Sequence, residues 1–239
     1  MDLIFFVRWP ATTGILLTFL AVSLAFGTPA TVQPDESSSK DSFIYEFLPT
    51  TNFDGGPPFN SLLTSGKTGT GHDTRSFMQF EVTGATLGTG ERATLNLFVK
   101  DTAAAGFGGS PSPSFAISAE VYSLTSSWSE STVTWASQPS MHNTLIDRQV
   151  IDGTNRWETF DVTSLVQGWL SNPSTNFGLA VIQPGVVIDG SGQKVAAVYD
   201  SASGINRPFL QIVPEPTTIG AAMVLLALLR RQRTLVEGD

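Results

Sequence analysis

The middle of the chain alternates apolar and polar residues over short runs, a pattern typical of β-strands with one buried face. Clusters of Gly, Pro, Ser, Thr and Asn separate these runs, as expected for turns between strands. The predicted strands lie at 77–82, 93–99, 118–124, 157–162, 177–182, 195–199 and 209–213. Many short strands in a segment of this size predict an all-β fold, a single antiparallel jelly-roll β-sandwich.

One stretch has helical rather than strand periodicity. At 162–170 the spacing places Val162, Leu165, Val166 and Trp169 on one face of a helix. The sequence therefore predicts one short helix within the β-sandwich domain, which we place at 41–213.

The N-terminus has the features of an export signal. An apolar run at 15–26 has the length of a signal-peptide core, follows Arg8 and ends at small residues suited to cleavage. We predict a signal peptide at 1–30, cleaved by signal peptidase, and a linker at 31–40. An uncleaved N-terminal anchor is the alternative, and both interpretations imply export.

The C-terminus carries a second apolar segment between a proline turn and a basic stop. The uncharged stretch at 217–229 has thirteen residues, and as a helix it would reach about 20 Å, short of the ~30 Å hydrocarbon core. Arginines at 230–233 favour the cytoplasmic side of a membrane. The residues that define the turn and the stop are Pro214, Glu215, Pro216, Arg230, Arg231 and Arg233.

In order and spacing, the segment at 213–233 resembles the PEP-CTERM sorting signal of Gram-negative bacteria. The resemblance implies transient anchoring in the inner membrane through the apolar helix and cleavage near Pro-Glu-Pro by an exosortase. The expected destination is the cell surface or the extracellular matrix. A tail anchor or a poorly structured hydrophobic end is the alternative.

Composition excludes several classes of protein. The chain has no cysteine, so it has neither a disulfide framework nor a thiolate metal site. Residues 35–216 hold 18 Asp and Glu against 9 Lys and Arg, a net charge of −9. A segment this acidic has no basic surface for nucleic acid, so we expect no nucleic-acid partner.

Several blocks of the domain resemble the DNRLRE family of carbohydrate-binding modules, over residues 41–213. These blocks are Arg75-Ser76-Phe77-Met78-Gln79-Phe80, the Trp-x-Glu-x-x-x-Thr-Trp run from Trp128 to Trp135, and Phe160-Asp161-Val162-Thr163 with Trp169. The resemblance implies a non-catalytic β-sandwich that binds glycans, including acidic ones such as alginate in some members. Two features depart from the family: Asp54 stands where glycine is usual, and the last strand runs into Pro-Glu-Pro instead of ending in tyrosine.

Three cations and one tryptophan are the candidate sugar-binding residues. Guanidinium clasps carboxylates with paired hydrogen bonds, which would suit uronic acids, and cations are scarce in this domain. An indole offers a flat apolar surface to a sugar ring. The candidates are Arg75, Lys67, Arg207 and Trp128. The alternatives are internal salt bridges for the cations and core positions for the tryptophans, including the motif residues Trp135 and Trp169; for Asp161 we predict a structural, helix-capping role.

The sequence offers little cofactor or catalytic chemistry. Asp41, Asn52 and Asp54 have hard oxygen ligands near one end of the domain and form a candidate site for structural calcium. The two histidines, His72 and His142, fall in no zinc-binding spacing, and no nucleophile elbow or phosphate loop is present. We therefore predict a protein that is not an enzyme and has no catalytic residues.

Two functions fit these features. The first is an exported module that binds extracellular or cell-envelope polysaccharide. The second is a structural or adhesive matrix protein that uses the same sandwich without a defined sugar site.

Overall fold

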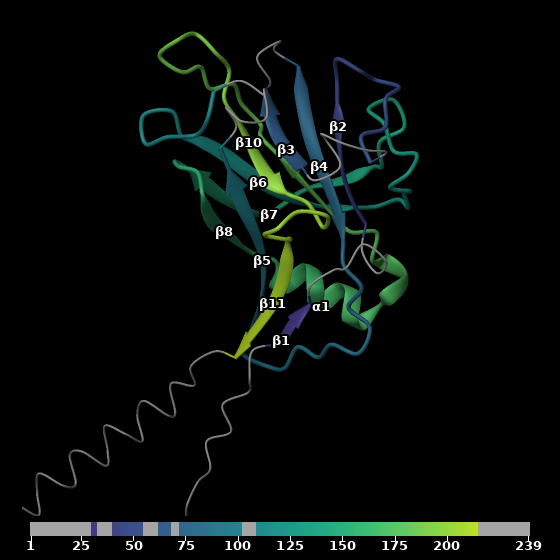
Figure 1. Cartoon of the computed structure of the whole chain (residues 1–239). Helices are drawn as coiled ribbons and strands as arrows, with labels where there is room; N and C mark the ends of the chain where they lie inside the picture. Colours follow the sequence, from purple (N-terminus) through teal and green to yellow (C-terminus); the bar gives the residue numbers. More distant parts are fainter. Residues whose placement is uncertain (1–29, 33–39, 55–61, 68–71, 102–108, 215–239) are drawn as a thin grey trace, which may run out of the picture.

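The computed structural model describes residues 30–32, 40–54, 62–67, 72–101 and 109–214 (Figure 1). The predicted signal peptide lies outside the described residues except for Ala30, and the sorting segment lies outside them beyond Pro214. Within the described ranges, no helix is long and apolar enough to cross a membrane.

The described chain consists of eleven strands, one α-helix and one 3-10 turn. The elements are β1 (Ala30–Val32), β2 (Lys40–Tyr45), β3 (Leu62–Lys67), β4 (Asp73–Gln79), β5 (Glu91–Lys100), β6 (Ile117–Leu124), β7 (Met141–Ile151), β8 (Arg156–Asp161), α1 (Thr163–Ser171), η2 (Pro173–Thr175), β9 (Leu179–Ile182), β10 (Ala196–Asp200) and β11 (Phe209–Pro214).

These strands form two layers. The first layer is β8–β5–β11–β1, and the second is β2–β4–β9–β6–β7; β10 and β3 continue the hydrogen bonding from β5 to β4. Every pairing between the strands is antiparallel. The predicted all-β sandwich with one short helix is confirmed.

The main core lies between the two layers, because alternate residues of each strand point inward. In β5, Leu95, Leu97 and Val99 are fully buried. They share a core cluster with Val121 of β6 and Val181 of β9 in the other layer. The alternate residues of β5 therefore face outward from the first layer.

Helix α1 closes one end of this core, near β11 and β1 (Figure 1). Val166 and Trp169 are its buried residues, at 1% and 2% exposure. The Thr163 hydroxyl accepts a hydrogen bond from the Ala93 amide at 3.0 Å, which ties the first turn to β5. The helical periodicity read from the sequence thus marks the face of α1 that packs on the sheets.

A second cluster of apolar residues lies on the outer side of the second layer. Trp128 and Val133, from the segment at 125–140, pack against strand residues there. The strand residues they cover are Ile44, Phe77, Leu124 and Ala180. The segment at 125–140 therefore covers the outer face of β2, β4, β9 and β6, and we call it the covering segment.

Candidate functional site

Trp128, in the covering segment at 125–140, lies in the second apolar cluster. Its side chain is 8% exposed, and its ring centroid lies 6.0 Å from that of Phe77. The indole Nε1 donates to the carbonyl oxygen of Phe177 at 3.0 Å, so its polar group is also engaged. Trp128 thus presents no open ring face to a sugar.

Arg75 fastens the other end of the covering segment to β4. Its guanidinium carbon lies 4.7 Å from the ring centroid of Trp135, a cation–π contact. Its Nη1 donates to Gln138 Oε1 at 2.8 Å, and Gln138 Nε2 donates to the Trp135 carbonyl at 3.0 Å. The contacts that the structure shows for Arg75 are therefore structural ones within the domain.

Lys67 lies near Arg75 and forms an ion pair with Asp73. Both cations also act on Glu46. The Asp73 amide donates to Glu46 Oε2 at 2.9 Å, and this hydrogen bond lowers the pKa of the Glu46 carboxyl. Burial opposes this effect, and the nearby charges of Lys67, His72 and Arg75 lower the pKa further. The cations Lys67 and Arg75 at this end of β3 and β4 thus interact with carboxylates of the domain itself.

Arg207 is not grouped with Arg75 and Lys67. It lies half-buried before β11, next to Asn206, whose amide groups donate to Asp200 Oδ2 at 3.0 and 3.1 Å. Asp200 pairs with Leu62 at the opposite end of β3 from Lys67. Five residues of strand separate these ends, or about 17 Å.

The calcium candidates have internal partners. Asp41 Oδ2 accepts a hydrogen bond from the Ala202 amide at 2.5 Å. Asn52 Oδ1 accepts from the Asp54 amide at 3.2 Å, and Asn52 Nδ2 donates to the carbonyls of Glu130 and Val133. Among the described residues, no group of three or more His, Cys, Asp or Glu is placed to hold a metal ion. Calcium stays a prediction, which melting temperatures with and without a chelator would test.

Asp161 supports the start of α1. Its Oδ1 accepts a hydrogen bond from the Thr163 amide at 2.9 Å. Burial raises the pKa of the Asp161 carboxyl, but the hydrogen bonds from Thr163 and the nearby charge of Arg92 together outweigh this effect and leave the pKa below its ordinary value. The carboxylate therefore stabilises the first turn of α1.

A buried carboxylate lies on the outer side of β6. Glu120 is 2% exposed, and its Oε1 accepts from Arg148 Nε of β7 at 2.7 Å. Tyr122 donates its hydroxyl proton to Glu120 Oε2 at 2.6 Å, and this hydrogen bond raises the pKa of Tyr122. Both carboxylate oxygens are thus held by neighbouring side chains.

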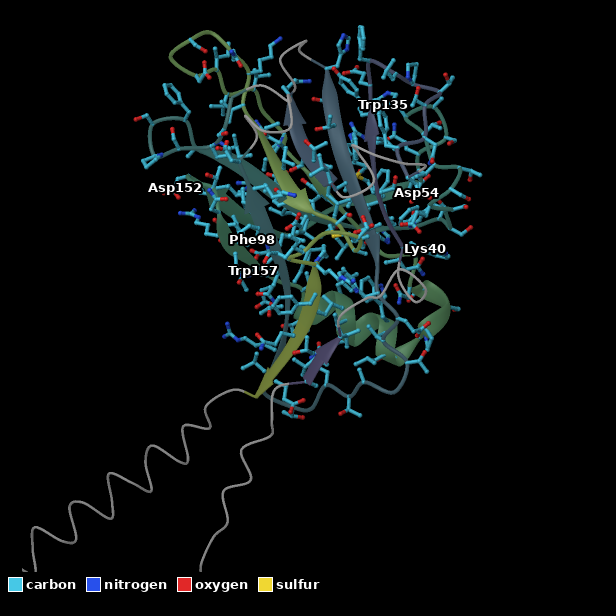
Figure 2. All side chains as sticks on the ribbon, in the orientation of Figure 1. Lys40, Asp54, Phe98, Trp135, Asp152 and Trp157 are labelled. Carbon is cyan, nitrogen blue, oxygen red and sulfur yellow. The ribbon has the colours of Figure 1, made fainter. Side chains whose placement is uncertain are left out.

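The first layer carries an exposed aromatic group on its outer face. Trp157 of β8 is 41% exposed, and its ring centroid lies 5.4 Å from Phe98 of β5 and 5.1 Å from Phe209 of β11. We call these three residues the Trp157 cluster. Figure 2 shows Phe98 and Trp157 beside each other on one side of the sandwich, with Trp135 on the other side.

Polar side chains flank the Trp157 cluster along the strands. Two residues from Phe98 along β5, Asn96 pairs with Thr159 of β8, whose hydroxyl donates to Asn96 Oδ1 at 2.9 Å. Lys100 lies two residues from Phe98 in the other direction along β5, and its Nζ is 2.7 Å from Asp200 Oδ1. Residues two apart on a strand are about 7 Å apart and share a face. The aromatic cluster therefore has hydrogen-bonding groups at both ends.

Sequence reasoning missed the Trp157 cluster, although it predicted all three strands that carry it. Phe98 faces Trp157 directly in the β5–β8 register, and Phe209 faces Asn96 in the β5–β11 register. These registers depend on pairing between distant segments. The available signal was an aromatic residue at an outward position of each predicted strand.

An antiparallel sandwich of this size that exposes an aromatic ring beside polar groups is typical of β-sandwich binding modules. Residues 33–213 match the family model of carbohydrate-binding module family 96, and the chain belongs to this family. Among the described strands, the matched segment contains β2 to β10 and all of β11 except Pro214. No curated protein matches the sequence.

Proposed function

We propose that this protein is an exported, non-catalytic module that binds extracellular or cell-envelope polysaccharide. The observation that carries the proposal is membership of a carbohydrate-binding family across residues 33–213, almost the whole described fold. The finer resemblance to DNRLRE modules, in Arg75 and the tryptophan motifs, supports the same function.

The geometry of the carboxylates supports a non-catalytic role. Glu120 is held by Arg148 and Tyr122, and Asp41 by the Ala202 amide. A carboxylate that acts as an acid or base on a glycosidic bond must reach the bond itself. These two buried carboxylates are instead committed to contacts inside the domain.

Binding is tested with the chain freed of its predicted terminal signals. Residues 30–214 contain every described strand, the main core and the second apolar cluster, so this polypeptide retains the contacts that stabilise the described fold. It should migrate more slowly in native gels that contain its polysaccharide than in gels without it. Unchanged mobility across a broad set of neutral and acidic polysaccharides would contradict the proposal.

The ends of the chain support sorting by exosortase-type processing. In this proposal the apolar helix at 217–229 holds an inner-membrane intermediate until cleavage near Pro-Glu-Pro, after which the module reaches the cell surface or matrix. The order of turn, apolar helix and basic stop is the supporting observation.

Replacing Pro214, Glu215 and Pro216 by alanine should block this processing. In a host that contains an exosortase, we expect the variant to accumulate uncleaved in the inner-membrane fraction, detected by immunoblotting. Replacing Arg156, far from the signal in sequence, is the control and should leave cleavage unchanged. Normal processing of the triple-alanine variant would indicate a different export route.

A structural or adhesive role is the second candidate, and the long strand β7 favours it. This strand lies at the end of the order of strands, and Val150 on it is 62% exposed. Exposed edge strands are surfaces on which chains associate. Concentration-dependent assembly in the absence of polysaccharide, measured by sedimentation, would support this role instead.

A further inference from the structure

We propose that the Trp157 cluster is the sugar-stacking platform of this module, and that its ligand is an uncharged pyranose chain. This inference rests on the proposed polysaccharide binding and adds to it the site and the chemical class of ligand.

The orientation of the indole is held by its two neighbours. The planes of Phe98 and Phe209 are inclined to that of Trp157 by 70° and 67°, so both phenyl rings meet the indole in edge-on geometry. Such contacts are favourable arrangements for aromatic pairs. Contacts with Phe98 of β5 and Phe209 of β11 therefore hold the Trp157 ring in position, while 41% of the residue stays exposed.

A positioned and exposed indole matches the apolar side of a sugar. A pyranose ring presents C–H groups on its face and hydroxyl groups around its edge. Binding sites for such molecules combine apolar aromatic surface with a few placed polar groups. With centroids 5.1 and 5.4 Å from that of Trp157, the two half-buried phenyl rings extend the apolar patch around the exposed indole, which predicts stacking of a single sugar unit on Trp157.

The polar groups on either side are placed to meet the edge of the sugar. The Asn96 and Thr159 pair lies about 7 Å along the strands from Phe98 and Trp157, in the same row as Phe209, and Lys100 lies about 7 Å from Phe98 in the other direction. Asn96 and Asp200 are buried at 7% and 1% exposure, whereas Thr159 is exposed and the Lys100 side chain is 37% exposed. The Thr159 hydroxyl, which can donate and accept, and the Lys100 ammonium, which donates, are therefore the groups that a chain lying over Trp157 along the strand direction would reach.

Charge around the platform favours an uncharged glycan. Lys100 is paired with Asp200, and Arg156 lies 2.5 Å from Asp152 and 2.6 Å from Glu158. A uronate would have to compete with these carboxylates for the cations. The net charge of −9 on residues 35–216, from 18 acidic and 9 basic residues, also repels polyanions at long range.

The test uses residues 30–214 in native gels containing hydroxyethylcellulose, xylan, galactomannan, β-glucan or dextran as neutral probes. Alginate and polygalacturonate are the acidic probes. We expect at least one neutral polysaccharide to retard the wild type, and Trp157→Ala to weaken that binding by about ten-fold or more. Trp157→Phe should retain part of the binding.

Phe47→Ala is the matched control. Phe47 is an exposed aromatic, 53% exposed, that follows β2 and contacts His72 rather than the Trp157 cluster. This variant should bind as the wild type does. Near-ultraviolet circular dichroism and a cooperative melt establish that each variant is folded.

The possible results separate the two proposals. If a folded Trp157→Ala variant binds polysaccharide as strongly as the wild type does, the platform proposal is wrong, but the proposed polysaccharide binding still stands. Retardation by the acidic probes alone would overturn the uncharged ligand. Retardation by none would overturn both proposals. If sedimentation shows a dimer that Trp157→Ala converts to monomer without any glycan binding, the cluster is a self-association surface and the platform is wrong.

Discussion

At the scale of single residues, the buried carboxylate of Glu120 is a demanding group in the sandwich. A charge taken out of water is costly unless partners replace the lost hydration. Arg148 and Tyr122 are those partners, from β7 and β6. The ion pair thus helps to fix the register of β7, which lies at the edge of its layer.

Removing Arg148 should therefore destabilise the domain. We expect Arg148→Ala to lower the free energy of unfolding by about 1–3 kcal/mol, because Glu120 would keep one of its two side-chain partners. Urea unfolding measures the change. Arg156→Ala is the control: Arg156 is 43% exposed and paired at the surface, so its loss should cost less than about 1 kcal/mol. Equal effects of the two substitutions would contradict this role for Glu120.

At the scale of elements, sequence patterns predicted seven of the described strands, β4 to β6 and β8 to β11, and missed β1, β2, β3 and β7. β5 and β6 are examples, since their alternation follows directly from the pleat. β7 was not predicted, and its burial explains why: most of its eleven residues are exposed or half-buried, so no alternation marks it. Its pairing with β6 also shifts register at Val121/Tyr122, which further weakens any regular pattern.

The connection into β9 depends on a glycine. Gly178 has φ +91°, and a Cβ added there would lie 2.2 Å from the Met78 carbonyl oxygen of β4. We expect Gly178→Ala to destabilise the domain by about 2 kcal/mol or more, since both the backbone conformation and the close approach oppose a side chain.

Gly168 in α1 is the matched control for this substitution. It is exposed, and a Cβ added there would meet no atom within 4 Å. Gly168→Ala should stabilise the domain by about 0.5–1 kcal/mol because alanine favours the helix. Thermal melts compare the two variants. Similar stability of both would show that Gly178 is not needed for the turn.

At the scale of the whole molecule, the sequence predicted the fold class and the kind of module but not the surface that we propose binds sugar. Of the tryptophans in the specific motifs, Trp128 and Trp169 are buried in the core clusters and Trp135 is half-buried against Arg75, as large aromatics in a fold of this size often are. The exposed Trp157 lies outside those motifs. Its meeting with Phe98 and Phe209 depends on the pairing of three strands, which the sequence pattern alone does not fix.

The central claim is that this acidic sandwich binds polysaccharide, and the mobility of residues 30–214 in polysaccharide-containing native gels tests it most directly. The account predicts slower migration of the wild type in at least one neutral gel, with the mobility of Trp157→Ala restored to that in the gel without polysaccharide. Unchanged wild-type mobility in every gel, for a protein shown to be folded, would contradict it.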